Sequence, residues 1–302
     1  MSAPFAIAGI QQYLSALSDN ILAMERRVGV VMSIYPWVQM VVFSELAPFG
    51  PLTVNAQGFP NATEARFQEL ARTHGIWLLP GSMFERVGTA IYNTATVISP
   101  TGEIVGRYRK MFPFYPYEEG VTPGAEFMVF DVPEVGRFGV SICYDMWFPE
   151  TSRTLAAMGA EVILHPTLTS SIDRDVELAM ARATAAQNQC FFFDVNGLGD
   201  GGIGRSIVVG PHGDVLHQAG SSDETFPIEI DIDRARRSRE TGLRGLGQPL
   251  KSFRDRLVEF PIYHPGWRKQ GYFGDLGPLA KPVRATRAGL PVRHGKAVRS
   301  KA

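Results

Sequence analysis

The chain has 302 residues, of which 45% are hydrophobic, and its 30 Lys and Arg residues balance its 30 Asp and Glu residues. This composition is typical of a globular protein and excludes disorder as the main state. The zero net charge argues against broad electrostatic binding of nucleic acid or of an anionic membrane. Cys143 and Cys190 are the only cysteines, which fits a reducing compartment. We expect a cytoplasmic protein, because the sequence shows neither a signal peptide pattern nor an apolar run of the ~20 residues that span a bilayer.

Short apolar strands alternate with amphipathic helices along most of the chain. Asn61 with Glu64 three residues later is typical of a capping box, and Gly75 is typical of a helix end. Pro149 suits the first turn of a later helix, and Asp233 is expected to cap the last helix. This alternation predicts a layered α/β fold. The predicted strands are 4–10, 40–43, 76–84, 92–98, 103–109, 127–131, 137–142, 162–165, 190–195, 206–210 and 226–232, and the predicted helices are 18–32, 61–75, 149–159, 174–189 and one from 233.

Cys143 is the most informative residue of the sequence. It follows the apolar strand 137–142 and precedes the helix that begins near Pro149. A thiol at such a junction lies near backbone N–H groups, which stabilise a thiolate and can form an oxyanion hole. The alternative interpretation is a buried structural cysteine. Cys190 opens the very apolar run 190–193, and we interpret it as a core residue.

Two charged residues also follow predicted strands. Glu45 comes after the buried strand 40–43, at the carboxyl edge where sites of α/β proteins gather, although a surface cap is the alternative. Lys110 precedes an aromatic, proline-rich loop, residues 111–124, that carries Glu118 and Glu119 or simply covers a core. No histidine pair has the spacing of a helical zinc site, and two cysteines cannot build a Cys-rich one, so we expect no metal.

The run 197–202 matches the Gly-x-Gly-x-x-Gly pattern of dinucleotide-binding loops. That function requires a helix to begin there, whereas the residues that follow predict another strand. We therefore expect no nucleotide site at these glycines.

Four segments together resemble the nitrilase superfamily of carbon–nitrogen hydrolases. They are the apolar strand that ends in glutamate (41–46), the Tyr-Arg-Lys segment (106–110), the cysteine elbow (141–150) and the Gly-x-Ser strand with its Pro-x-Gly turn (204–213). Their order and spacing extend the resemblance over roughly residues 4–260. The family implies a four-layer α-β-β-α sandwich that packs against a second copy, hence a homodimer or higher homo-oligomer.

The resemblance also implies the site residues. A Glu-Lys-Cys triad maps onto Glu45, Lys110 and Cys143. The family has a second active-site glutamate after the lysine. Counting forward from Lys110 selects Glu118, counting back from the following glycine selects Glu119, and we expect Glu118 to be catalytic. The residues expected to bind substrate are Tyr115, Glu119, Tyr144, Trp147, Pro166 and Thr167.

Two branches of the family imply two substrates. The segment after Lys110 resembles that of aliphatic amidases and formamidases, which implies hydrolysis of a small primary amide to a carboxylic acid and ammonia through a thioester. The elbow resembles that of N-carbamoylputrescine amidases, so an N-carbamoyl amine or amino acid is the alternative substrate. Nitrile hydrolysis is disfavoured, because Tyr144 and Asp145 follow the cysteine where nitrilases typically have Trp-Glu. This chemistry needs no redox step and no metal, so no cofactor is expected. A non-enzymatic ligand-binding or thiol-based sensor protein is the alternative of a different class.

The C-terminal segment differs from the rest of the chain. We expect a hydrolase domain over 1–265 and an arm or tail over 266–302. Residues 281–302 hold seven Lys and Arg residues and no acidic one, so they carry +7 and the rest of the chain −7. This complementarity favours a role in subunit association over nucleic-acid binding, with a flexible end as the alternative. The apolar residues expected to need a partner surface are Trp267, Tyr272, Phe273, Leu276 and Leu279.

Overall fold

The computed structural model describes residues 4–267 and 270–281. Its contacts divide the chain into two units. The first unit ends at Leu257 and leaves out Phe114–Glu119, whereas the second consists of Phe114–Glu119 and the chain from Val258 onward. Within the described residues, no helix is both long and apolar enough to cross a membrane.

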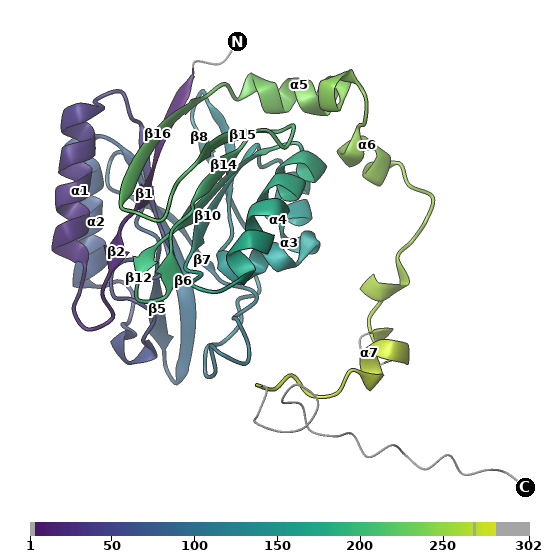
Figure 1. Ribbon diagram of the computed structural model, residues 1–302, viewed down its shortest axis with the longest axis horizontal. Coiled ribbons are helices and arrows are strands. Elements are labelled where there is room, and N and C mark those ends of the chain that lie inside the picture. Colours follow the sequence, from purple (N-terminus) through teal and green to yellow (C-terminus); the bar gives the residue numbers. More distant parts are fainter. Residues whose placement is uncertain (1–3, 268–269, 282–302) are drawn as a thin grey trace, which may run out of the picture. The chain divides into compact units, whose positions relative to one another are not determined.

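Two β-sheets form the middle of the first unit (Figure 1). The first has the strand order β16-β1-β3-β4-β6-β5, with β7 paired to β6, and the second has the order β15-β14-β11-β10-β9-β8. Strands β1, β3 and β4 are parallel to one another, as are β9, β10 and β11. The strands are β1 (Phe5–Gln11), β3 (Met40–Phe43), β4 (Trp77–Leu79), β5 (Ser82–Val87), β6 (Ala90–Ile98), β7 (Ile104–Arg109) and β16 (Glu224–Ile230) in the first sheet, and β8 (Met128–Val132), β9 (Gly136–Val140), β10 (Val162–Thr167), β11 (Phe191–Asn196), β14 (Ile207–Val209) and β15 (Val215–Gln218) in the second.

Helices cover the outer faces of both sheets. Helices α1 (Ile21–Ile34) and α2 (Ala62–His74) lie on the first sheet, and α3 (Pro149–Ala157) and α4 (Asp173–Asn188) lie on the second (Figure 1). The order of layers is therefore α-β-β-α, which confirms the predicted fold class. The remaining helices are α5 (Asp233–Thr241) and α6 (Pro249–Arg254) in the first unit and α7 (Gly271–Asp275) in the second.

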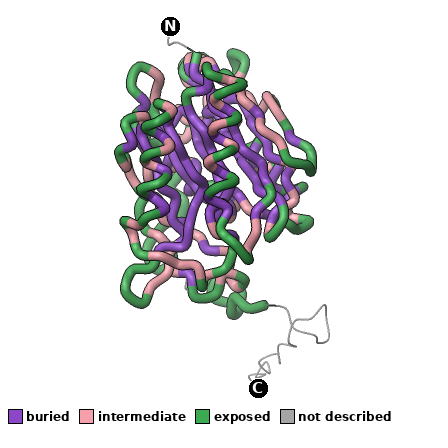
Figure 2. The backbone as a smooth tube through the Cα atoms, turned by 90° about the vertical axis from the view of Figure 1, so that its left-hand side faces the viewer, coloured by how far each residue is buried: buried purple, intermediate pink, exposed green. Residues whose placement is uncertain are grey.

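Alternating side chains along the strands fill the interfaces of this sandwich. On β1, Phe5 and Ile7 face the second sheet, where the Phe5 ring packs against Phe138. Ala8 and Ile10 point the other way and join the core beneath α1 and α2. A third core, beneath α3 and α4, contains Cys190, which is fully buried as predicted. Each large apolar side chain in these cores contributes about 1.5–3 kcal/mol of burial free energy. Figure 2 shows buried strands behind helices whose outer turns are exposed.

The predicted single strand over 76–84 is wrong, because the chain forms β4 and β5 with a turn at Pro80–Gly81 between them. Gly81 has φ +76°, a conformation that favours glycine. A Cβ atom at Gly81 would lie 1.8 Å from the backbone oxygen of Ser44. The glycine therefore lets this turn pack directly against the segment that carries Glu45.

Helix α2 begins and ends where the sequence predicts. The Asn61 side chain accepts a hydrogen bond from the Glu64 backbone N–H at 2.9 Å, and Gly75 ends the helix at φ +63°. The expected capping box is only half formed, because the Glu64 carboxylate binds the Arg107 guanidinium of β7 instead, at 2.9 and 3.0 Å. Asp233 likewise lies within the first turn of α5 and not at its cap.

The glycine-rich run 197–202 forms a hairpin, which confirms that no helix begins there. Strands β12 (Leu198–Gly199) and β13 (Gly202–Ile203) pair with each other, and β12 also pairs with β2 (Tyr13–Leu14). Gly199 and Gly201 have φ values of +81° and +110°. These glycines therefore serve a tight turn.

The second unit lacks an apolar core within the described part of the chain. The four clusters of buried apolar residues that the structure describes include no side chain of this unit. All five apolar residues that the sequence associated with assembly are exposed. The basic segment from 282 onward lies outside the described residues. Exposed apolar groups at this density are typical of a surface that needs a partner, so the role in association stays a prediction.

Truncation after Pro265 should lower the mass of the particle in solution, because it removes both the exposed apolar side chains and the basic segment. Light scattering on full-length and truncated protein measures this mass at equal concentration. The same mass for both chains would show that the segment is not an assembly element.

Candidate active site

The carboxyl ends of the parallel strands of both sheets meet at one place. The backbone N–H of Glu45, two residues beyond β3, donates to the carbonyl oxygen of Thr167 at the end of β10, at 3.3 Å. This bond joins the first sheet to the second. Side chains that follow these strands are therefore brought together, as is usual for α/β sites.

Glu45 and Lys110 form an ion pair that is almost fully buried. The Lys110 Nζ atom lies 2.8 Å from Glu45 Oε1. The amide of Asn93, on β6, donates to the same oxygen at 2.8 Å, and its backbone carbonyl accepts from the Lys110 N–H, also at 2.8 Å. Removing one partner of such a pair leaves the other charge buried without a partner, which typically lowers the free energy of unfolding by about 3–5 kcal/mol. Asn93 was not identified from the sequence, because a lone polar residue inside a strand pattern carries no distinctive signal.

Cys143 begins a short 3-10 turn, Cys143–Trp147, three residues beyond the end of β9. Its backbone φ of +45° lies in the left-handed region, which costs a non-glycine residue about 1–2 kcal/mol. Only 8% of the surface of Cys143 is accessible to solvent. Such strain persists where the surroundings impose it and is concentrated at functional sites.

Asp145 supplies the contacts that hold this turn. Its carboxylate accepts hydrogen bonds from the backbone N–H of Ile142 at 2.9 Å, the Tyr108 hydroxyl at 2.7 Å and the backbone N–H of Phe112 at 2.9 Å. Burial raises the pKa of Asp145 to about 6, although these hydrogen bonds oppose the shift. Since Tyr108 and Phe112 flank Lys110, this one carboxylate ties the cysteine turn to the lysine. Asp145 was not identified from the sequence as a site residue, although an aspartate three residues after the predicted strand 137–142 is a turn-capping signal.

The charges of Glu45 and Lys110 both act on the Cys143 thiol. Burial raises the pKa of the thiol well above its ordinary value, the negative charge of Glu45 raises it further, and the positive charge of Lys110 lowers it. The thiol is therefore protonated at neutral pH and needs a base before it can react. The structure thus brings together the three residues of the predicted triad.

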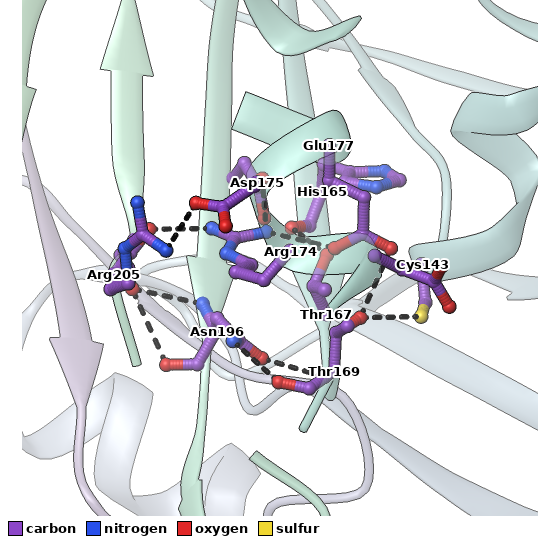
Figure 3. Close-up of polar contacts among 12 residues, drawn as sticks. Cys143, His165, Thr167, Thr169, Arg174, Asp175, Glu177, Asn196 and Arg205 are labelled. Carbon is purple, nitrogen blue, oxygen red and sulfur yellow. Dashed lines mark hydrogen bonds and ion pairs between the residues drawn. The ribbon is translucent and has the colours of Figure 1, made fainter. Parts of the chain in front are cut away.

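A second polar cluster adjoins the thiol, and the sequence analysis missed it. Cys143 Sγ lies 3.7 Å from the hydroxyl of Thr169, and this hydroxyl donates to Glu177 on α4 at 3.1 Å (Figure 3). Asn196 clamps the backbone of Thr169, accepting from its N–H at 2.9 Å and donating to its carbonyl at 3.0 Å. Nothing in the helical pattern distinguishes Glu177 from a solvent-facing acid, although it is buried.

The other predicted site residues fall into three groups. Tyr144 and Trp147 lie on the cysteine turn with their ring centroids 6.0 Å apart. Pro166 and Thr167 end β10, where the carbonyl of the buried Thr167 supports Glu45. Tyr115, Glu118 and Glu119 belong to the second unit, and the Glu118 carboxylate accepts a hydrogen bond from the backbone N–H of Phe114.

Aromatic rings surround the cysteine turn. Phe112 stacks on Phe148 with ring centroids 3.6 Å apart, and Phe148 also meets the edge of Tyr144 at 5.3 Å. Rings of this kind form the apolar lining of small-molecule sites, where a few polar groups fix the orientation of the ligand.

His165 lies beneath the site, fully buried on β10. Its Nδ1 atom is 2.7 Å from the Ser141 hydroxyl, and its ring packs against Phe192. Burial lowers the pKa of His165 to about 4. The imidazole is therefore neutral at neutral pH and acts as a hydrogen-bonding core residue.

Below its ordinary pKa of about 6.5, His165 should make the protein less stable as the pH falls. The unfolded chain takes up a proton there, whereas the folded chain does not until about pH 4. The unfolding equilibrium constant should therefore rise by up to a factor of about ten per pH unit across this window. Urea unfolding of wild type and His165→Asn at pH 7.5 and 5 should show this pH dependence in wild type and a weaker one in the variant. His212→Asn, on a surface turn, should behave like wild type, and parallel losses in all three proteins would contradict the assignment.

Comparison with known proteins identifies the family of the chain. The carbon–nitrogen hydrolase family model matches residues 5–240. A nitrilase of Pyrococcus abyssi is 32% identical over 212 residues, which cover 68% of this chain and 76% of the relative. An N-carbamoylputrescine amidase of Solanum lycopersicum is 30% identical over 61% of this chain and 69% of its own length. The amidase of Nesterenkonia sp. AN1, solved in complex with butyramide, is 25% identical with a TM-score of 0.69 and covers 78% of this chain and 94% of its own. The chain belongs to the carbon–nitrogen hydrolase family of the nitrilase superfamily.

Proposed function

We propose that the chain is a cysteine-dependent amidohydrolase that converts a small primary amide to a carboxylic acid and ammonia through a thioester. One observation carries this proposal: a buried carboxylate and a buried ammonium, 2.8 Å apart, both act on a thiol held at a strained turn. Three such groups can move a proton, attack a carbonyl carbon and stabilise the oxyanion that results.

Acylation of Cys143 is the first half of the reaction. Glu45 takes the thiol proton, and the thiolate sulfur forms a bond to the amide carbon. Lys110, together with the backbone N–H of Tyr144, stabilises the oxyanion that develops on the carbonyl oxygen. The proton on Glu45 passes to the nitrogen, the C–N bond breaks, and ammonia leaves behind a thioester on Cys143.

Hydrolysis of the thioester is the second half. A water molecule gives a proton to an active-site carboxylate and attacks the thioester carbon. The C–S bond breaks, the acid leaves, and the sulfur recovers its proton. We assign Glu118 to orient substrate and water, with Glu119 beside it in the same loop.

The acyl group that we propose is apolar. Phe112, Tyr144, Trp147 and Phe148 place aromatic surface around the cysteine turn. Such surface favours a hydrocarbon chain over a charged group. The similarity to an amidase solved with butyramide supports the same substrate class.

An N-carbamoyl amine or N-carbamoyl amino acid is the second candidate substrate. The cysteine elbow resembles that of N-carbamoylputrescine amidases, and a relative of that name is 30% identical over 210 residues. The same residues would attack the carbamoyl carbon. Hydrolysis of this group releases carbon dioxide together with ammonia, which separates the two candidates.

An ammonia-release screen over primary amides, N-carbamoyl compounds and nitriles tests the proposal, with carbon dioxide measured in parallel. We expect release from aliphatic or aromatic primary amides without carbon dioxide. Cys143→Ala provides the control: it should abolish turnover and leave the unfolding transition in place. Equal ammonia release by this variant would refute a cysteine mechanism.

Glu45→Gln and Lys110→Ala should each reduce kcat by at least about 100-fold, because each removes a positioned base or an oxyanion stabiliser. The Lys110 variant should also be less stable, since it leaves the buried Glu45 carboxylate unpaired. Steady-state kinetics with urea unfolding separates the two effects. Wild-type turnover by either variant would exclude the proposed triad.

Glu118→Gln should reduce kcat more than Glu119→Gln does, because the spacing from Lys110 assigns the second active-site glutamate to position 118. The two variants are matched in charge and in loop position, and their kcat values on one amide decide the assignment. A greater loss in the Glu119 variant would reverse it.

A further inference from the structure

The Cys143 thiol is linked to a second carboxylate in addition to the proposed base. A chain of two contacts leads from Sγ to the Thr169 hydroxyl at 3.7 Å and from that hydroxyl to Glu177 Oε1 at 3.1 Å (Figure 3). Thr169 follows β10, and Glu177 lies on α4. Neither residue has a role in the proposed reaction.

The hydroxyl of Thr169 has a single hydrogen, and this fixes the direction of the chain. The Glu177 carboxylate can only accept, so Thr169 donates to it. The threonine oxygen is then left to accept from the thiol. The order is S–H to O–H to carboxylate, and the thiol hydrogen is held toward Thr169.

Further hydrogen bonds hold both Glu177 and Thr169 in place. Glu177 also accepts from the Trp147 indole N–H at 3.4 Å and from Arg174 at 3.2 Å. Arg174 is fully buried and binds Asp194 at 2.8 Å as well, so the three charged groups of this cluster sum to −1. With Asn196 clamping the backbone of Thr169, neither partner can turn away from the thiol without breaking buried hydrogen bonds.

We propose that Thr169 and Glu177 are positioning residues for Cys143, which keep the resting thiol protonated and set the pH at which it ionises. The inference rests on the proposed role of Cys143 as nucleophile. This series of hydrogen bonds favours the protonated thiol. A thiolate would have no hydrogen to donate, and Thr169 could donate to it only by breaking its hydrogen bond to Glu177.

The charged groups around the thiol agree with this direction. Glu45 after β3 and Lys110 after β7 oppose each other in their effect on the thiol pKa, and Glu177 on α4 adds a second raising influence. Burial raises the pKa of Glu177 itself, Asp194 raises it further, and Arg174 lowers it. Removal of the Glu177 charge therefore leaves Glu45 and Lys110 in place, although it also removes the ion pair with Arg174.

The rate of Cys143 alkylation by iodoacetamide against pH tests the proposal, with the adduct on Cys143 quantified by mass spectrometry. Glu177→Gln should lower the pH midpoint of alkylation by about one unit, as expected when a like charge is removed from beside an ionising group. Thr169→Val should move it in the same direction, and Thr169→Ser, which keeps the hydroxyl, should retain the wild-type midpoint. Asp175→Asn is the matched control: it removes a charge from the same helix at an exposed carboxylate bound to Arg205, and it should leave the midpoint unchanged.

Wild-type midpoints in both Glu177→Gln and Thr169→Val would overturn the proposal. If Glu177→Gln does not fold, the two Thr169 variants decide, because they leave the Arg174 pair intact. A purely structural role would reduce reactivity equally at all pH values and would not shift the midpoint. The alkylation measurement needs no substrate. If the midpoint shifts in a protein that releases no ammonia, the proposed function is refuted, but the positioning role of Thr169 and Glu177 stands.

Discussion

The buried ion pair between Glu45 and Lys110 is the constraint on which the site depends. The two residues follow β3 and β7 of the same sheet, and their 2.8 Å contact and the amide of Asn93 help to offset the desolvation of both charges. A displacement of either strand would leave a charge buried without its partner. The Gly81 turn and the bond from Glu45 to Thr167 fix the same segment from two further directions. The carboxylate is therefore positioned before any substrate arrives, which is the condition for efficient electrostatic catalysis.

The cysteine turn is attached to this pair through one residue. The Asp145 carboxylate accepts hydrogen bonds from Ile142, Tyr108 and Phe112. These bonds couple the strained conformation of Cys143 to β7, the strand that Lys110 follows. Strain of about 1–2 kcal/mol at the cysteine is small beside several charge-assisted hydrogen bonds. The fold can therefore sustain a left-handed nucleophile without a glycine at that position.

Two buried charge clusters act on the thiol. The first, at strand ends of the first sheet, includes the Glu45 carboxylate and the Lys110 ammonium. The second, on α4 and β11, has two carboxylates and one guanidinium and so carries a net negative charge. Both carboxylates that act on the thiol, Glu45 and Glu177, favour its protonated form, and its reactivity then depends on where its proton can go. The first cluster follows strands of the first sheet and the second lies on α4 and β11, so the α-β-β-α layering brings both toward the thiol.

The sequence by itself determined the order of strands and helices, the fold class and three residues that follow strand ends, since alternating apolar residues, capping residues and the elbow are local patterns. It also excluded a helix, and with it a dinucleotide site, after the glycine run 197–202, because the residues that follow have a strand pattern. Only the tertiary structure decided that Asn93, Asp145, Thr169 and Glu177 surround the triad. Each of these is one polar residue in an ordinary strand, turn or helix, and its partners lie 3 to 48 residues away along the chain. The split of the predicted strand 76–84 has the same origin, because it follows from the close approach of Gly81 to Ser44, a contact that no local pattern encodes.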